Sequence, residues 1–260
     1  MVKIYIDPGH GGNDPGATGN GLQEKDLNLK IARYMRDYLL NNYSGVSIRM
    51  SRETDKTVTL AARTNDANSW GANAFISIHI NAGGGTGFES YVYPGVGQAT
   101  RNLQNAVHNE VAKAFSGFPD RGKKQANFHV LRETNMSAVL TENGFIDTKK
   151  DADFLKSDAN LRKVGEAHAL GVAKYFGLQK KEEPGQNVYY RVVTGSFSER
   201  ANAEQRVAEL KQKGFDSFIL EHNGMYRVIT GSFTSRENAE KRVEELKKAG
   251  FDSFIDVYVV

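Results

Sequence analysis

The sequence predicts an α/β domain, with a mostly parallel sheet sandwiched by helices, followed by a small α+β domain of the ferredoxin-like βαββαβ type. In the first two thirds of the chain, short β-branched segments alternate with helical apolar patterns. In the last third, residues 190–219 are nearly repeated at 226–255, with 22 of 30 positions identical. We therefore expect domains at 1–178 and 188–260, joined by a linker at 179–187 that mixes charges with Pro and Gly.

Each element of the first domain follows from a local pattern. The apolar run near the N-terminus is short and rich in β-branched residues, which favours a strand, and Leu27, Ile31, Tyr34 and Tyr38 recur at the spacing of one helical face. The same reasoning assigns the later segments. Along the chain we expect strands at 2–7, 46–50, 74–80, 87–94, 128–131 and 138–145, and helices from about 27, over 60–70, over 103–115 and from about 153 to 176.

In each repeat of the second domain, an alternating strand precedes a helix and a second short strand. Gly214 and Gly250 stand where a helix C-terminus favours a left-handed residue. The ferredoxin-like order leaves one sheet face without helices, and such a face can serve as a binding platform. Strand alternation should turn about half of the candidate contact residues toward the core. These candidates are Tyr190, Ser196, Phe197, Tyr226, Ser232 and Phe233.

Composition restricts the chemistry and the partners. The chain has no cysteine, which excludes disulfides, thiolate metal sites and cysteine nucleophiles, so a metal would need His, Asp or Glu ligands. No apolar run approaches the roughly 20 residues that a membrane span needs. The first residues lack a signal-peptide pattern. We therefore expect no membrane partner, synthesis in the cytoplasm, and action elsewhere only after release or non-classical export.

Four residues carry candidate metal chemistry at the carboxyl ends of the predicted strands, where α/β sheets bind their ligands. His10 follows the first strand in IDPGHGG, Glu24 precedes the first long helix, and His79 and Glu142 lie near the ends of two later strands. Two imidazoles and one carboxylate form the usual catalytic zinc set of a protein without cysteine. The fourth residue is then a candidate base beside the metal's water.

Each of the four also has a structural interpretation. A histidine after Pro-Gly is commonly a turn residue, and an acid at position 24 suits the positive end of a helix. His79 and Glu142 lie in strands that look buried, where a polar side chain without a partner is costly. Because all four fall at one edge of the predicted sheet, the pattern favours a shared metal site over four separate structural roles.

The stretches IDPGHGGNDPGA, NGLQEKD, SIHINA and VLTENGF resemble the signatures of the zinc-dependent N-acetylmuramoyl-L-alanine amidases of the Amidase_3 family, and the tandem GSF repeat resembles a SPOR domain. The resemblance implies Zn²⁺ held by His10, Glu24 and His79, with Glu142 as the catalytic glutamate. It also implies hydrolysis of the amide between N-acetylmuramic acid and the L-alanine of the peptidoglycan stem peptide, by a zinc-hydroxide mechanism with a glutamate general base. Ser137 stands where the family often has Pro, which bears on rigidity rather than chemistry.

Three further residues are candidate substrate contacts, each with a structural alternative. Asn81 follows His79 by two residues and either orients substrate or holds its loop. Glu89 lies inside a predicted strand near a glycine-rich loop and is the rival to Glu142 in base chemistry. His129 alternates with apolar neighbours, so it either assists a developing charge or simply packs.

The remaining polar residues of interest are expected to be structural. His108 lies on an amphipathic helix beside Asn and Glu, which predicts a solvent-facing side chain. His168 and His222 have no neighbouring motif. Arg63, in LAART, fits a buried salt bridge as readily as a substrate contact.

The charge of the second domain bears on its partner. Residues 188–260 carry eleven Lys and Arg and eleven Asp and Glu, a net charge of zero. Nucleic acid recognition normally requires a basic excess on one face, so we expect no nucleic acid partner. The SPOR resemblance implies that this domain binds the glycan strands of peptidoglycan, while the first domain takes the muropeptide. No sequence feature indicates the oligomeric state.

The layout of catalytic domain and tandem SPOR units is most similar to that of the mother-cell lytic amidases of Gram-positive spore formers, which implies an autolysin that degrades the wall during sporulation. Two alternatives are a phage-type endolysin with the same activity and a catalytically silent wall-binding scaffold. A peptidoglycan carboxypeptidase or deacetylase fits the same zinc chemistry. The intact set of four site residues favours an enzyme over a scaffold.

Overall fold

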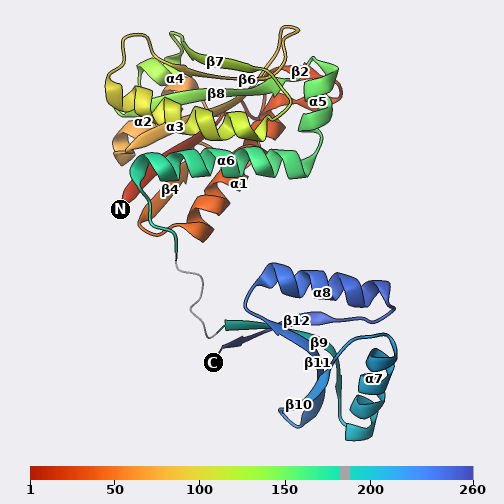
Figure 1. The fold of residues 1–260 in the computed structure, drawn as a ribbon. Coiled ribbons are helices and arrows are strands. Elements are labelled where there is room, and N and C mark those ends of the chain that lie inside the picture. The colour runs from red at the N-terminus through yellow and green to blue at the C-terminus, as the bar shows by residue number, and fades with distance from the viewer. Residues whose placement is uncertain (182–187, 260) are drawn as a thin grey trace. The chain divides into compact units, whose positions relative to one another are not determined.

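The computed structural model describes residues 1–181 and 188–259 and divides the chain into two compact units, Met1–Lys181 and Glu182–Val260 (Figure 1). Most of the expected linker, residues 182–187, lies outside the described residues. The backbone of Gln179 and Lys181 hydrogen-bonds to residues 42–44 of the first unit, at 3.0 and 2.7 Å. Residues 179–181 are thus held by the first unit.

The first unit is built on a six-stranded sheet with the order β4-β1-β5-β8-β6-β7. Strands β4, β1, β5 and β8 are parallel, β6 runs antiparallel to β8, and β7 is parallel to β6. The mostly parallel α/β fold expected from the sequence is confirmed. The strands are β1 (Val2–Pro8), β4 (Val46–Met50), β5 (Ala74–Asn81), β6 (Phe88–Val92), β7 (Asp120–Gln125) and β8 (Ser137–Phe145), with a separate ribbon of β2 (Thr18–Gly19) and β3 (Leu22–Gln23).

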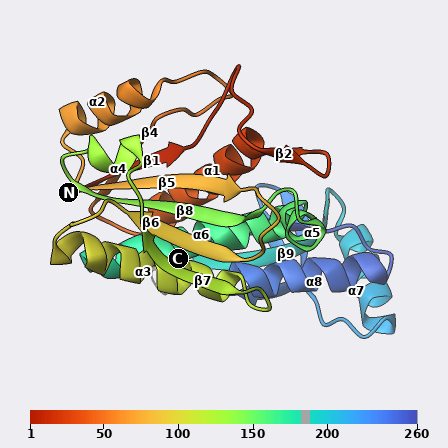
Figure 2. The same cartoon turned by 90° about the horizontal axis from the view of Figure 1, so that it is seen from above.

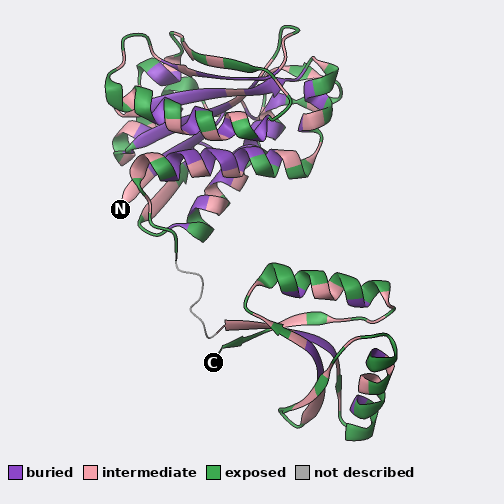
Figure 3. Cartoon of the chain, viewed as in Figure 1, coloured by how far each residue is buried: buried purple, intermediate pink, exposed green. Residues whose placement is uncertain are grey.

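Helices cover both faces of this sheet, and the central strands and inner helix sides are buried (Figures 2 and 3). On one face α1 (Glu24–Asn42), α3 (Gln98–Ala114) and α6 (Asp158–Phe176) enclose the larger apolar core. On the other face α2 (Leu60–Trp70) and α4 (His129–Arg132) cover a smaller core, and α5 (Lys149–Leu155) precedes α6. No helix in the described part of the chain is both long and apolar enough to cross a membrane.

Two predicted elements of the first unit are wrong. The expected strand at 128–131 is the short helix α4, because the adjacent residues Val130 and Leu131 both pack into the smaller core, whereas a strand would point them to opposite faces. The expected single helix to residue 176 is two helices. Ser157 separates them and caps the second one, because its side chain accepts a hydrogen bond from the backbone N–H of Asn160.

His108 is buried rather than solvent-facing, a further correction. Its side chain lies between Ser90 Oγ, 2.8 Å from Nδ1, and Asp120 Oδ1, 2.9 Å from Nε2. Asp120 begins β7, an edge strand that the sequence pattern did not reveal, so the partner that makes this histidine internal was missing from the prediction. Burial lowers the pKa of His108 despite the nearby Asp120 carboxylate.

The second unit is a four-stranded antiparallel sheet with the order β10-β11-β9-β12, the ferredoxin-like arrangement, and it carries two helices. Val192 and Val228 lie in the core between sheet and helices. Tyr190, Phe197, Tyr226 and Phe233 all pack against that same core, so none of these aromatics belongs to the open face as a contact residue. The elements are β9 (Val188–Phe197), α7 (Arg200–Gln212), β10 (Phe218–His222), β11 (Met225–Phe233), α8 (Arg236–Lys248) and β12 (Phe254–Val259).

A buried histidine ties α6 to the strand that carries Glu142. His168 Nδ1 donates to the Val164 carbonyl at 2.8 Å, and Nε2 accepts from Thr141 Oγ1 at 2.9 Å. Burial lowers the pKa of His168 to about 4. Since the unfolded pKa is about 6.5, the unfolded chain takes up a proton at a higher pH than the folded chain. The contribution of His168 to the stability of the first unit is therefore fully present above about pH 6.5 and is lost as the pH falls toward 4.

We expect His168→Gln to remove this pH dependence. Relative to the variant, the wild-type free energy of unfolding should fall by about 3 kcal/mol between pH 7 and pH 4. Urea unfolding followed through Trp70, the single tryptophan, reports on the first unit. His222→Gln, in the second unit, is the control. Parallel pH profiles for wild type and His168→Gln would contradict this assignment.

Candidate metal centre

Two buried arginines shape the loop that follows β1 and presents His10. Arg63 forms an ion pair with Asp7 at 2.7 Å and donates to the carbonyl of His10 at 2.8 Å. Arg52 donates to the carbonyl of Gly9 at 2.9 Å. His10 itself has a φ of 61°, which few residues other than glycine adopt. The fixed carbonyls hold the loop in the conformation that turns the His10 side chain toward α1.

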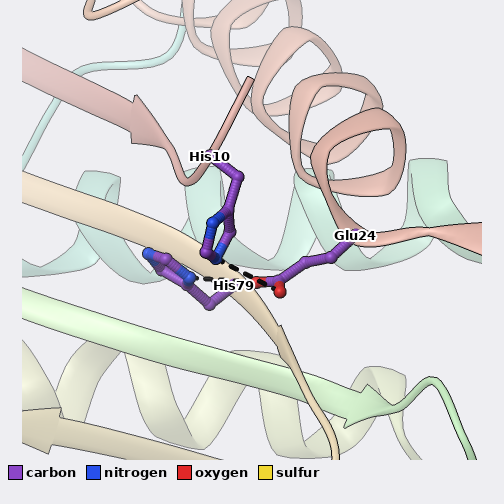
Figure 4. Close-up of side chains that lie close together, drawn as sticks. All are labelled: His10, Glu24 and His79. Atoms are coloured by element: carbon purple, nitrogen blue, oxygen red, sulfur yellow. Dashed lines mark hydrogen bonds and ion pairs between the residues drawn. The ribbon is translucent and has the colours of Figure 1, made fainter. Parts of the chain in front are cut away.

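Three side chains from three elements converge at the carboxyl ends of β1 and β5 (Figure 4). Glu24, the first residue of α1, places Oε2 3.2 Å from His10 Nε2 and Oε1 3.0 Å from His79 Nδ1. The backbone N–H groups of Ala17 and Ile80 each donate to this carboxylate, at 2.8 and 3.0 Å. Glu24 is only 3% exposed, so its charge is held by fixed donors rather than by water.

The donor set fits a zinc ion. One ligand atom from each of His10, Glu24 and His79 lies within 4.8 Å of the others, which is compact enough for the three to share one ion. Two imidazole nitrogens and one carboxylate oxygen are the ligands that catalytic zinc uses without cysteine. A tetrahedral ion would keep one position for water or substrate.

Two glycines leave the space that this arrangement needs. A Cβ at Gly9 would lie 2.2 Å from the Cε1 atom of His79, and a Cβ at Gly16 would lie 2.5 Å from Oε2 of Glu24. Both contacts are too short to exist without displacement of the ligand side chains. The glycines of the PGHGG and PGA stretches therefore have a packing role at the metal centre as well as a role in turns.

The polar neighbours of His10 and Glu24 favour the charged form of each side chain. The pKa of His10 is raised, because the carboxylates of Glu24 and Asp14 outweigh the opposing effect of burial. Asp14 Oδ2 lies 2.8 Å from His10 Nδ1 and orients the ring so that Nε2 faces the centre. Although burial alone would raise it, the hydrogen bonds with His10 and His79 hold the pKa of Glu24 below its usual range.

Glu142 lies beside this centre in the sheet. It is the direct partner of His79 in the β5–β8 register, and its Oε2 atom is buried with no hydrogen-bond partner among the described residues. Burial, with smaller contributions from Glu24 and Glu89, raises its pKa well above the usual value. β8 continues past Glu142 to Phe145, so this residue lies within the strand rather than at its end.

A cavity of about 460 Å³ opens over His79 and Glu142 on the face covered by α2 and α4. Its walls are partly apolar, with Val58, Leu60, Phe128, Val130 and Leu140 opposite the polar residues. His10, Arg63 and His129 also contribute to the lining. The cavity thus joins the candidate ligands and the candidate base to a half-open, largely apolar space.

The three candidate substrate contacts have different positions. His129 lines the cavity from the start of α4, with its Nε2 atom buried and unpartnered among the described residues. Glu89 is the cross-strand partner of Glu142, but it is 2% exposed and fully engaged by neighbouring donors. Asn81 donates to Glu89 Oε1 at 2.8 Å, which favours the loop-holding interpretation.

The structure also adds residues that carried no motif. Arg63 forms the buried salt bridge that the sequence allowed, and its position on the His10 loop makes it a positioning residue. Arg52, Asp7 and Asp14 were not predicted. Arg52 contacts backbone carbonyls and Asp7 pairs with Arg63, 56 residues away, and neither kind of contact leaves a local pattern. Asp14 pairs with His10, four residues before it, and this short spacing is the one signal that could have found it.

Comparison with known proteins places these residues in a family context. Residues 4–174 match the N-acetylmuramoyl-L-alanine amidase family, and residues 186–256 match the SPOR domain. The chain is 54% identical over 220 residues to the sporulation-specific N-acetylmuramoyl-L-alanine amidase of Bacillus subtilis (strain 168), an alignment that covers 85% of each chain. It is 43% identical over 185 residues to the endolysin of Bacillus phage SPP1, covering 68% of this chain and 67% of that protein.

Solved structures show the same fold. The catalytic domain of CwlV, an N-acetylmuramoyl-L-alanine amidase from Bacillus (Paenibacillus) polymyxa var. colistinus, superposes with a TM-score of 0.65 at 33% identity, covering 69% of this chain and 100% of that domain. The N-acetylmuramoyl-L-alanine amidase from Clostridium difficile 630 also gives a TM-score of 0.65, at 32% identity, and covers 68% of this chain and 97% of that one.

We expect Gly9→Ala to weaken zinc binding roughly 10- to 100-fold, because the added methyl group must displace the His79 ring. Competition with a chromogenic chelator measures the zinc affinity. Gly97→Ala is the matched control, since a Cβ there meets nothing within 4 Å. Equal zinc affinities for Gly9→Ala and wild type would show that His79 is not a ligand in this position.

Proposed function

This chain belongs to the N-acetylmuramoyl-L-alanine amidase family, and on that premise we propose that it hydrolyses peptidoglycan with zinc held by His10, Glu24 and His79 and with Glu142 as the general base. The observation that carries the proposal is the convergence of these three side chains beside an unpartnered Glu142 oxygen in one cavity. The bond is the amide between N-acetylmuramic acid and L-alanine. The family match supports that bond over those cut by a carboxypeptidase or a deacetylase.

In this proposal Glu142 carries the proton from the attacking water to the leaving group. When bound, zinc supplies Lewis-acid polarisation of the scissile carbonyl, acidifies the attacking water and adds a positive charge that favours ionised Glu142. Glu142 Oε2, which has no competing partner among the described residues, accepts the proton of that water. The apolar surroundings that raise its pKa then favour delivery of the proton to the leaving nitrogen of L-alanine.

We place this activity in lysis of the mother-cell wall during sporulation, after the protein is released from the cytoplasm. The support is the relative named as sporulation-specific, whose alignment covers 85% of this chain. The phage endolysin aligns with 68% of the chain and is the second candidate setting for the same reaction. A silent scaffold is disfavoured, because all four proposed active-site residues are present and adjacent.

The SPOR unit is the peptidoglycan-binding part of the chain, and we propose its helix-free sheet face as the glycan platform. Ile219 and Ile255 pack on the helix side, so the preceding Phe218 and Phe254 point to the other face. The strand register aligns four apolar residues across that face, in the order Phe218, Ile229, Val193 and Phe254. The two outer rings are half exposed and flank two buried aliphatic side chains, so the accessible apolar surface for sugar rings comes from Phe218 and Phe254.

We expect Glu142→Gln to lower kcat about 10²- to 10⁴-fold, because glutamine cannot accept the water proton. One zinc ion should remain bound per chain. Release of new alanine amino termini from purified walls measures the rate, and elemental analysis measures the zinc. Glu133→Gln, at an exposed position in the same unit, should retain wild-type turnover. A Glu142→Gln variant with near-wild-type kcat would exclude the residue as general base.

We expect the double variant Phe218→Ala, Phe254→Ala to lose most of its sedimentation with purified sacculi, since the apolar row keeps only its two buried members. The matched control is Arg200→Ala, Arg236→Ala. These positions are also equivalent in the two repeats, but they lie on the helices. If the phenylalanine variant sedimented as well as the arginine variant, the glycan platform would lie elsewhere.

A further inference from the structure

We propose that Arg121, supported by Lys124, forms a subsite for a carboxylate of the stem peptide, on the side of Glu142 away from the apolar cavity. The inference rests on the proposed function and names the part of the substrate that this side of the site would recognise. Both cations come from β7, the edge strand of the sheet, and neither contributes to the cavity described above. The ligand expected is a free carboxylate on the residue that follows L-alanine in the stem peptide.

The subsite is built around the buried carboxylate of Glu89. Oε2 of Glu89 accepts from Arg121 Nε at 2.8 Å and from Lys124 Nζ. Oε1 accepts from Asn81 Nδ2 and from the Tyr91 hydroxyl, each at 2.8 Å. Four donors therefore occupy one carboxylate that is almost fully buried, which holds both cations in place.

The two terminal nitrogens of Arg121 are available to a ligand. It engages Glu89 only through Nε, and its guanidinium carbon lies 4.8 Å from the centre of the Phe145 ring. Among the residues that the structure describes, neither terminal nitrogen of Arg121 has a hydrogen-bond acceptor. The side chain is 34% exposed. A guanidinium fixed in this way presents two parallel N–H donors, the geometry that binds a carboxylate through two hydrogen bonds.

Charge supports an anionic ligand. Two cations face one carboxylate, so the cluster of Glu89, Arg121 and Lys124 carries a net charge of +1. Those ion pairs, together with the Tyr91 hydrogen bond, lower the pKa of Glu89 although burial opposes them. Glu89 is therefore a weak base whose two oxygens are both occupied, which disfavours its interpretation as a rival to Glu142.

The position of the cluster matches the reach of the substrate. Glu89 is the cross-strand partner of Glu142, and Arg121 folds back over Glu89 from the next strand, so the guanidinium lies about one strand spacing, roughly 5 Å, beyond the base. Two residues of an extended peptide span at most about 7 Å, so a carboxylate on the residue after L-alanine reaches this cluster when the scissile amide is at Glu142. The sugar and its lactyl group then lie toward the cavity.

The test compares cleavage of purified walls with cleavage of the same walls after carbodiimide coupling of their carboxyl groups to ammonia. The full-length, zinc-loaded protein is used, and new alanine amino termini are counted. We expect wild type to cleave the amidated walls with a kcat/KM roughly tenfold lower. Arg121→Gln should cleave both substrates equally, with the loss mainly in KM. Arg101→Gln, at an exposed position on α3, should keep the wild-type preference.

Arg121→Lys guards against a folding defect, because it keeps a cation beside Glu89 but lacks the two-donor fork. With an unchanged melting temperature it should still lose most of the preference for free carboxylates. Equal cleavage of both walls by wild type, or a retained preference in Arg121→Gln or in folded Arg121→Lys, would overturn the subsite. Failure of wild type to release alanine termini from either wall would instead refute the proposed function.

Discussion

The first unit depends on the burial of one carboxylate, Glu24, at the point where three elements meet. This side chain is hydrogen-bonded to His10 from the loop after β1 and to His79 from β5, and it also accepts from the backbone of Ala17 and Ile80. Burying a carboxylate without such donors would cost much free energy, so the fold has to hold each donor in place around Glu24. The Arg63 ion pair with Asp7 fixes the loop that carries His10, and the glycines of that loop leave room for the side chains of Glu24 and His79.

A second constraint operates around the sheet, where three carboxylates lie close together: Glu142 on β8 and Glu89 on β6 are cross-strand partners, and Glu24, at the start of α1, contacts His79 on β5. Glu24 and Glu89 are ionised by their donors, whereas Glu142 lies between them with a free oxygen and a raised pKa. The environments push the proton affinities of adjacent acids apart, which is how one site can hold both fixed charges and a mobile proton. Of the three acids, only Glu142 lines the cavity, so the mobile proton is the one that substrate can reach.

The metal residues and the fold could be predicted from the sequence because their signals are local. Short apolar, β-branched runs identify β1, β5 and β8; His10 follows β1, His79 lies near the end of β5, and Glu142 lies within β8. β7 could not be predicted, since an edge strand of sequence DRGKKQ is polar on both faces and lacks alternation. With β7 missing, the partners of His108 and Glu89 were missing too, and one was placed in solvent and the other regarded as a possible base. Which half of the candidate contact residues in the SPOR unit faces the core could not be predicted, because alternation gives two faces but not their identity; the four aromatics pack against the core.

Anomalous diffraction at the zinc edge, from crystals of the zinc-loaded protein, tests the central claim most directly. We expect one strong peak within bonding distance of His10 Nε2, His79 Nδ1 and a Glu24 oxygen, with Glu142 Oε2 near but not bonded to it. A zinc peak held by other residues, or fully loaded protein with no peak between these three side chains, would contradict the account.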